Sequence, residues 1–301
     1  MQNYPGSVTK PKGFKANGLY CGIKKSGKLD LSLIYSEVPA VSAAVFTQNS
    51  VKAAPLLVCQ KHIKKNTAQA IIINSGNANC FTGDFGLLYA EKTTELMAKL
   101  LRIPKAHVLV SSTGIIGKPL PFKKIQKATP ILVNGLSVAG GGKAAKGILT
   151  TDLQTKEIYV TTTIGGKKVT IGACAKGSGM TAPNMATMLA FITTDAAVNA
   201  KMLKAALKNA ADQSFNCITV DGCMSTNDMV VVMANGLAEN KTITKAGKDF
   251  DQFSKSLNTV CLDLAKKIVL DGEGATKFIE INVAGAKNFS QGRQIGLAVA
   301  N

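Results

Sequence analysis

The sequence contains no tryptophan, and aromatic residues make up only 5% of its 301 residues. Arginine is almost absent as well, because Arg102 and Arg293 are the only two among 36 basic residues. Proteins that bind nucleic acid use arginine to recognise bases and phosphates, and aromatic side chains to stack on bases. In this chain, lysine supplies nearly all of the positive charge behind the net charge of +18. It predicts a solvated basic surface and no nucleic-acid partner.

Histidine is also scarce. His62 and His107 are the only two, and neither lies in a glycine-rich motif. This argues against a zinc site and against a Ser-His-Asp triad. The seven cysteines include no Cys-x-x-Cys pair, which is typical of free thiols in a reducing compartment. We therefore expect no metal site.

Long apolar runs are missing too. None approaches the ~20 residues that a membrane-spanning helix needs. The first residues, Met-Gln-Asn-Tyr-Pro-Gly, do not combine a basic start with an apolar stretch, so a secretory signal is not expected. A hydrophobic content of 46% with little low-complexity sequence is typical of a globular protein. The sequence predicts a cytoplasmic protein with no membrane partner.

Short apolar runs alternate with amphipathic segments, which favours a layered α/β or α+β fold. The runs predict strands at 43–47, 70–73, 107–111, 157–163, 168–174, 188–193, 229–234 and 278–283. Apolar residues spaced three and four apart predict helices at 85–101, 199–213 and 248–269.

The segment Gly140-Gly141-Gly142-Lys143 has the composition of a phosphate-binding loop but not its spacing. Lys143 is followed by Ala144 where such a loop needs serine or threonine, and no glycine stands five residues before Gly142. The segment therefore predicts the approach to a helix rather than a nucleotide site.

Residues 175–190 carry the most informative signal, Ala-Lys-Gly-Ser-Gly-Met-Thr-Ala-Pro-Asn-Met-Ala-Thr-Met-Leu-Ala. Thr187 follows the small residue Ala186 and stands at the entrance to an apolar run. Its hydroxyl is placed to attack the Ala186 carbonyl, and hydrolysis of the resulting ester would release an N-terminal threonine. The free α-amine, with a pKa near ~7.7–8.0, is then a base for the hydroxyl of its own residue. The alternative is a tight loop with Thr187 as ordinary strand filler.

Further motifs occur in a fixed order with this one. They are 74–79 (Asn-Ser-Gly-Asn-Ala-Asn), 112–117 (Ser-Thr-Gly-Ile-Ile-Gly), 149–152 (Leu-Thr-Thr-Asp), 225–228 (Ser-Thr-Asn-Asp) and 271–277 (Asp-Gly-Glu-Gly-Ala-Thr-Lys). Together with 175–190, they make the chain resemble the bifunctional ornithine acetyltransferases (glutamate N-acetyltransferases) of arginine biosynthesis. The resemblance runs over essentially all 301 residues.

The resemblance implies a role for each matching residue. Thr187 is the nucleophile and carries the acetyl group as an ester, in a cycle that takes it from N-acetylornithine and gives it to glutamate. Thr113 and Gly114 form the oxyanion hole, while Thr150, Lys176 and Glu273 join Thr187 in binding substrate, and Ala186–Thr187 is the cleavage site. On the residues alone, 113–114 is more simply a strand exit. The alternatives for the other two are a surface lysine at Lys176 and a turn carboxylate at Glu273. Asp228 and Asp271 are expected to be structural turn residues.

The resemblance also implies the architecture. The fold is an α+β layered sandwich of the self-cleaving, N-terminal-nucleophile type, divided into an α segment, 1–186, and a β segment, 187–301, that remain intertwined. Two copies of each would form a heterotetramer. No cofactor is implied, although acetyl-CoA stays open as an additional acetyl donor. The family continues beyond the point that corresponds to Asn301. The resemblance therefore leaves open whether this chain is active by itself.

Two other functions remain open on the sequence. One is a related self-cleaving hydrolase or aminopeptidase, in which water is the acceptor. The other is an inactive remnant or a basic binding protein. The motifs at 149–152 and 271–277 favour the transferase.

Overall fold

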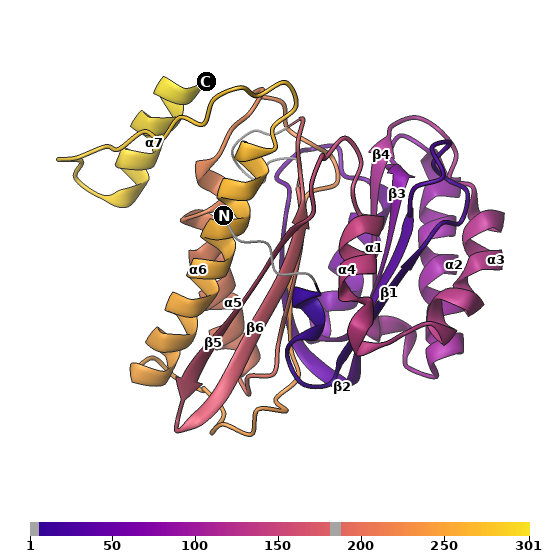
Figure 1. The fold of residues 1–301 in the computed structure, drawn as a ribbon, viewed down its shortest axis with the longest axis horizontal. Coiled ribbons are helices and arrows are strands. Elements are labelled where there is room, and N and C mark those ends of the chain that lie inside the picture. The colour runs from indigo at the N-terminus through magenta and orange to yellow at the C-terminus, as the bar shows by residue number, and fades with distance from the viewer. Residues whose placement is uncertain (1–5, 181–187) are drawn as a thin grey trace.

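An eight-stranded mixed sheet runs through the part of the chain that the computed structural model describes, residues 6–180 and 188–301 (Figure 1). Its order is β4-β3-β2-β8-β7-β6-β5, and β1 pairs with β2 outside this path. The strands are β1 (Phe14–Leu19), β2 (Leu31–Phe46), β3 (Thr67–Asn77), β4 (Val108–Ile115), β5 (Lys156–Ile164), β6 (Lys167–Lys176), β7 (Leu189–Thr194) and β8 (Met229–Ala234).

Helices flank the sheet in two groups. Around the β1–β4 part lie α1 (Ala54–His62), α2 (Gly83–Leu101), α3 (Phe122–Asn134) and α4 (Gly141–Gly147). Helix α6 (Lys248–Leu270) packs against β5 and β6, and α5 (Ala200–Asp212) packs against β2 and α6 (Figure 1). Helix α7 (Phe289–Ala300) lies near the end of α5, where Arg293 forms an ion pair with Asp212. Short 3-10 turns occur at Ser7–Thr9, Ile63–Lys65, Lys105–His107, Val138–Gly140 and Phe215–Cys217.

The long helices bury the stripes that the sequence predicts. In α6, Phe253, Val260 and Ile268 are fully buried and share one hydrophobic cluster with the sheet. Helix α5 begins where the Asn199 side chain accepts a hydrogen bond from the Met202 amide, at 2.9 Å. Such a cap satisfies a backbone donor that the first turn leaves unpaired. The helices predicted at 85–101, 199–213 and 248–269 are therefore confirmed.

The central strands are buried on both faces. In β7, Phe191 belongs to the cluster on the β1–β4 side, whereas Ala190 and Ile192 belong to the cluster beneath α5 and α6. A strand covered on both sides needs apolar residues at every position. This explains why β8 reads Met-Val-Val-Val-Met-Ala without alternation.

Strands from both sides of the predicted cleavage bond lie together in the sheet. Strand β6 pairs antiparallel with β7, Lys176 facing Leu189, and β7 pairs parallel with β8. Ala186 and Thr187 themselves lie outside the described residues. The sheet is thus completed by residues that precede and follow this bond.

The layered α/β fold is confirmed, but one of the predicted strands is wrong. Residues 278–283 are not a strand, although apolar Phe278, Ile279 and Ile281 favoured one, and they pair with no strand of the described chain. Strand β1, the first half of β2, and helices α1, α3 and α7 were not predicted. The approach to a helix predicted at 140–143 is confirmed, because α4 begins at Gly141. In the described residues, no helix is both long and apolar enough to cross a membrane.

Candidate active site

Two of the predicted site residues, Thr113 and Thr150, contact a third, Lys176. Strands β3 and β4 run parallel and end together, which puts Thr113 and Gly114 at the end of β4. Lys176 is the last residue of β6. Its ammonium donates a hydrogen bond to Thr150 Oγ1 at 2.8 Å and another to Thr113 Oγ1 at 3.4 Å. The structure therefore joins Thr113, Thr150 and Lys176 from three separate segments.

The lysine is buried, not a surface side chain. Lys176 is only 3% exposed, and its Nζ lies 3.9 Å from Asp152 Oδ2. Burial lowers the pKa of Lys176, partly opposed by the negative charge of Asp152. Asp152 in turn accepts from Lys156 Nζ and from the Gly177 amide, both at 2.7 Å. Burial raises the pKa of Asp152, but the charges of Lys176 and Lys156 outweigh it and hold that pKa at about 2.

Gly114 occupies a backbone position that a side chain cannot share. Its φ is +129°, and a Cβ built there would overlap the backbone of Gly76 and Asn77 on β3. The absence of a side chain lets the two strand ends approach closely and leaves the Gly114 backbone exposed. An exposed backbone amide at a fixed strand end is the kind of donor that stabilises a developing oxyanion.

Glu273 lies at the edge of this group. Its amide donates to the Ser178 carbonyl at 2.8 Å, and its side chain lies against Gly179. The side chain is exposed, and its charge raises the pKa of Lys176. Asp271 is structural, as predicted, because its carboxylate accepts from Lys156 Nζ at 2.5 Å and from the Leu153 amide at 3.0 Å.

The turn 225–228 is more than the structural turn that the sequence suggested. Asn227 Nδ2 donates to the carbonyls of Ala78 (2.7 Å) and Ser112 (2.8 Å). Asp228 Oδ1 accepts from the Met188 amide at 3.1 Å. The turn therefore connects Met188, which follows Thr187 in the chain, with Ser112, which precedes Thr113. Only folding brings these positions together, so sequence spacing gave no signal for it.

Asp228 is almost fully buried, at 1% exposure. Burial raises its pKa well above the usual value, opposed by the nearby hydroxyls of Ser225 and Thr47. Despite these hydroxyls, no residue of the described chain makes a well-directed hydrogen bond to Asp228 Oδ2. The predicted nucleophile Thr187 and the residue before the predicted cleavage bond, Ala186, lie outside the described residues.

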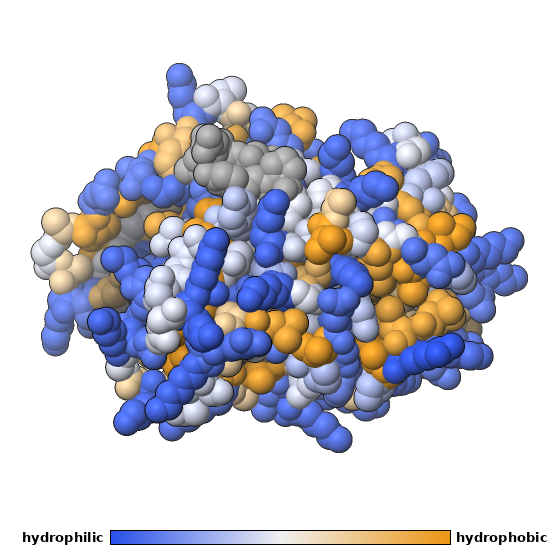
Figure 2. Space-filling model, turned by 60° about the horizontal axis from the view of Figure 1, so that its bottom comes forward, coloured by the Kyte–Doolittle hydropathy of each residue, from blue (hydrophilic) through white to orange (hydrophobic). Residues whose placement is uncertain are grey.

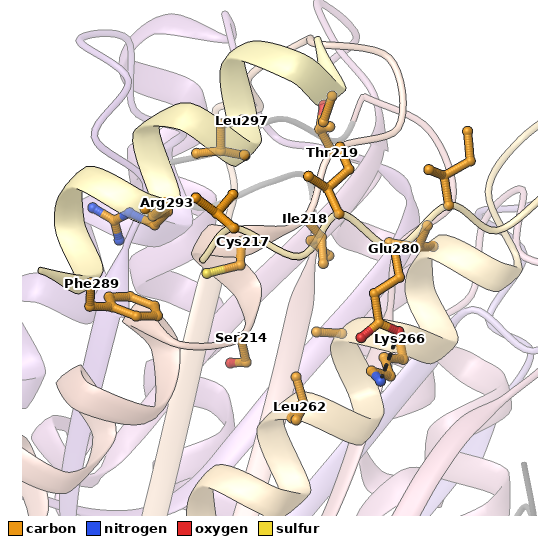
Figure 3. Close-up of a pocket in the computed structure, with 18 of the residues that line it drawn as sticks. Ser214, Cys217, Ile218, Thr219, Leu262, Lys266, Glu280, Phe289, Arg293 and Leu297 are labelled. Carbon is orange, nitrogen blue, oxygen red and sulfur yellow. Dashed lines mark hydrogen bonds and ion pairs between the residues drawn. The ribbon is translucent and has the colours of Figure 1, made fainter. Parts of the chain in front are cut away.

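Other parts of the structure offer no competing centre of this kind. In residues 6–180 and 188–301, no group of three or more His, Cys, Asp or Glu side chains is arranged to hold a metal. A cavity of about 500 Å³ lies between α6, α7 and the segment before α7, lined by Leu262, Phe278, Phe289 and Leu297 (Figure 3). It contains none of the predicted site residues. Hydrophilic residues are scattered over the face in Figure 2 between apolar patches, in keeping with a solvated basic surface.

Comparison with known proteins shows which family the chain resembles. The ArgJ family model matches residues 15–301. The arginine biosynthesis bifunctional protein ArgJ of Caldanaerobacter subterraneus subsp. tengcongensis is 48% identical over 301 residues, which are 100% of this chain and 74% of that protein. The Bacillus subtilis protein of the same name is 52% identical over 284 residues, 94% of this chain and 69% of that protein. This chain thus spans about seven tenths of the length of these relatives.

Solved structures agree with the fold. A Bacillus halodurans ArgJ structure matches with a TM-score of 0.57 and 44% identity, covering 60% of this chain and 94% of that one. An ornithine acetyltransferase from Mycobacterium tuberculosis, complexed with ornithine, matches with a TM-score of 0.53 and 38% identity, covering 59% and 94%. An Ochrobactrum anthropi aminopeptidase with an N-terminal-nucleophile fold, at 11% identity and a TM-score of 0.55, shares the fold alone. The chain belongs to the ArgJ family, the bifunctional acyltransferases of arginine biosynthesis.

Proposed function

We propose that this chain moves an acetyl group from N-acetylornithine to glutamate through an ester on Thr187. The observation that carries the proposal is the contact of Lys176 with both Thr113 and Thr150, at the end of β6. It assembles an oxyanion turn and two polar binding groups where the chain leads into the segment that contains Thr187. Family membership at 48–52% identity favours this transferase over a hydrolase or a basic binding protein.

The chemistry takes place in two half-reactions. In the first, Thr187 Oγ attacks the acetyl carbonyl while the α-amine of the same residue accepts the hydroxyl proton. The carbonyl oxygen becomes an oxyanion, which we assign to Thr113 and the Gly114 amide. The C–N bond then breaks, ornithine takes the proton and leaves, and the acetyl group stays on Thr187. In the second, the α-amine of glutamate attacks the ester and Thr187 Oγ recovers its proton.

The substrate groups suggest partners for the remaining residues. We assign the α-carboxylate that both substrates share to Thr150 and Lys176. The free side-chain ammonium of N-acetylornithine is assigned to Glu273, whose exposed carboxylate lies at the edge of the group. No cofactor is needed for these steps, and acetyl-CoA is a second donor to be tested in place of N-acetylornithine.

The same nucleophile is proposed to cut the chain at Ala186–Thr187, which frees the α-amine that the cycle needs. The solved relatives support this, because 94% of each of their chains corresponds to only 60% and 59% of this one. That share is close to the length of the 1–186 segment. We propose that the two products stay together and that two pairs form a heterotetramer.

Two measurements test the proposal. Intact-mass spectrometry of the purified protein should find two fragments, the second beginning at Thr187, and Thr187→Ala should remain one chain. Release of ornithine from N-acetylornithine should require cleaved Thr187, and the acetyl group should appear on glutamate. Equal cleavage of Thr187→Ala would exclude the hydroxyl as the agent, and acetate as the only product would favour a hydrolase.

A further inference from the structure

A loop from the N-terminal part of the chain is fixed beside the candidate site. The buried carboxylate of Asp30 accepts hydrogen bonds from the amides of Cys21 (2.6 Å), Ile23 (2.7 Å) and Lys24 (2.9 Å). The Asp30 carbonyl accepts from the Ser75 amide at 2.9 Å. One aspartate therefore holds the loop 21–24 against the end of β3.

This anchoring places Lys24 next to the oxyanion turn. A Cβ built on Gly76 would lie 3.0 Å from Lys24 Cγ and 3.1 Å from Ile23 Cγ2, so the stem of Lys24 covers Gly76. Gly76 in turn pairs with Gly114 across the β3–β4 ladder. Lys24 thus packs on the backbone that supports the oxyanion donor of β4.

Only one hydrogen-bond acceptor within the described residues contacts the ammonium of Lys24. Its Nζ donates to the Leu29 carbonyl at 2.7 Å, the one acceptor it has in residues 6–180 and 188–301. An ammonium carries three N–H donors, so two remain for a ligand. The side chain is half-buried, and burial lowers its pKa to about 8, opposed by Asp30 and Asp152. At neutral pH it is still mostly a cation.

Lys176 differs from Lys24 in the number of partners around its ammonium and in its exposure. Its donors face Thr150 and Thr113, with Asp152 beyond them, and its side chain is 3% exposed. Lys176 is assigned to the α-carboxylate, so a substrate with two carboxylates needs a second cation, and Lys24 is the more exposed of the two lysines. The positive charge of Lys176 contributes to lowering the pKa of Lys24, so the two ammonium groups are near enough to interact through space.

We propose that Lys24 binds the side-chain carboxylate of the acceptor amino acid, and so selects an acidic acceptor. The inference rests on the proposed transfer to glutamate. Glutamate and N-acetylornithine share an α-carboxylate but differ at the end of the side chain, a carboxylate in one and an ammonium in the other. Lys24 attracts the first and repels the second, whereas Glu273 does the opposite. Lys24 is therefore a binding residue for the second half-reaction, with Glu273 serving the first.

The test compares Lys24→Met with Lys24→Arg and with Lys25→Met, a matched control because Lys25 is the adjacent, exposed lysine. We expect Lys24→Met to raise the KM for glutamate by about ten- to a hundredfold, the range for losing a hydrogen bond to a charged group. Glutamine, which lacks the second carboxylate, should lose little as an acceptor. Ornithine release without glutamate should not fall, because Lys24 repels the side-chain ammonium of the donor and its loss removes that repulsion. Lys24→Arg should restore most of the preference for glutamate, and Lys25→Met should behave as the unaltered protein.

A binding measurement makes the result independent of turnover. Calorimetry should show that the unaltered protein binds glutamate more tightly than glutamine, and that Lys24→Met removes the difference. Unchanged discrimination in Lys24→Met, by KM or by binding, would overturn the inference, as would an unaltered protein that does not prefer glutamate. Failure of the proposed function is distinguishable, because it appears as no ornithine release from N-acetylornithine in any variant.

Discussion

Asp228 Oδ1 lies 3.1 Å from the backbone nitrogen of Met188, the residue that follows Thr187. The contact fixes the start of β7 before its first ladder pair, Leu189 with Met229. Asn227, which precedes Asp228 in the chain, donates to the Ser112 carbonyl at 2.8 Å. One turn therefore positions the strand that follows the predicted nucleophile and the strand that carries the predicted oxyanion turn.

Asp228→Asn is expected to stabilise the protein at neutral pH. Burial raises the pKa of Asp228, so the folded state keeps the acid protonated at pH values where the unfolded chain ionises it. That difference favours the unfolded state increasingly as pH rises above about 4. Asparagine keeps an acceptor for Met188 without an ionisable group. Urea unfolding should show the variant more stable than the unaltered protein at pH 7, with the gap closing toward pH 4.

Asp228→Ala separates this charge effect from the positioning effect. It removes the acceptor and leaves the buried Met188 amide unpaired, a loss of about 1–3 kcal/mol. We expect it to be destabilised and to cleave slowly at Ala186–Thr187, whereas Asp228→Asn cleaves well. If Asn and Ala variants are equally slow to cleave, the carboxyl group itself takes part and the positioning role is wrong.

Asp152→Asn should have the opposite pH dependence. The pKa of Asp152 is held at about 2 in the folded protein, below its usual value of 3.8. The stability that this provides, on the order of 2 kcal/mol, is present above pH 4 and is lost as pH falls from about 4 to about 2. The variant should therefore unfold at lower urea than the unaltered protein at pH 7, with the gap narrowing below pH 4. Glu95→Gln, an exposed control, should show no such gap.

Gly114→Ala is expected to lower both stability and acetyl transfer, because the added Cβ would overlap the backbone of Gly76 and Asn77. Gly117→Ala is the control. Gly117 also has positive φ, at +78°, but a Cβ there meets nothing within 4 Å. The control should show only modest strain, of about 1 kcal/mol. Similar unfolding midpoints for the two variants would mean that close approach of β3 and β4 is not what Gly114 provides.

Helix positions could be predicted from the sequence where one face alone is apolar. Helix α6 fits this case, with Phe253, Leu257 and Leu264 buried. The apolar pattern gave wrong or incomplete strands where hydrogen bonding to a neighbouring strand decides the structure. Residues 278–283 have the composition of a strand, but they find no partner strand in the described chain. Strand β2 was recognised only near its end, since its register shifts between Tyr35 and Ala40 interrupt the pattern.

The site was predictable only in part, and for a physical reason. Motifs identified Thr113, Thr150 and Lys176, which the structure brings together. The sequence did not single out Lys24 and Asp228 as candidates because their contacts join segments far apart in the chain. A lysine in a charged loop and an aspartate in a turn have ordinary structural explanations until folding shows what they touch.

Lys176→Met tests whether the buried lysine serves the reaction or only balances charge. Alone, it should destabilise the protein, because Asp152 loses one of the two ammonium groups that offset its burial. It should also reduce transfer, since Thr113 and Thr150 lose their common donor. The double variant Lys176→Met/Asp152→Asn removes one charge of each sign and leaves Lys156 paired with Asp271 at 2.5 Å. Its destabilisation should be less than the sum of the two single effects, because contacting residues are coupled.

Acetyl transfer should stay low in this double variant even though part of its stability returns. Urea unfolding would measure the stability, and an assay of acetylated glutamate would measure the transfer. Recovery of transfer together with stability would show that Lys176 acts only on the fold.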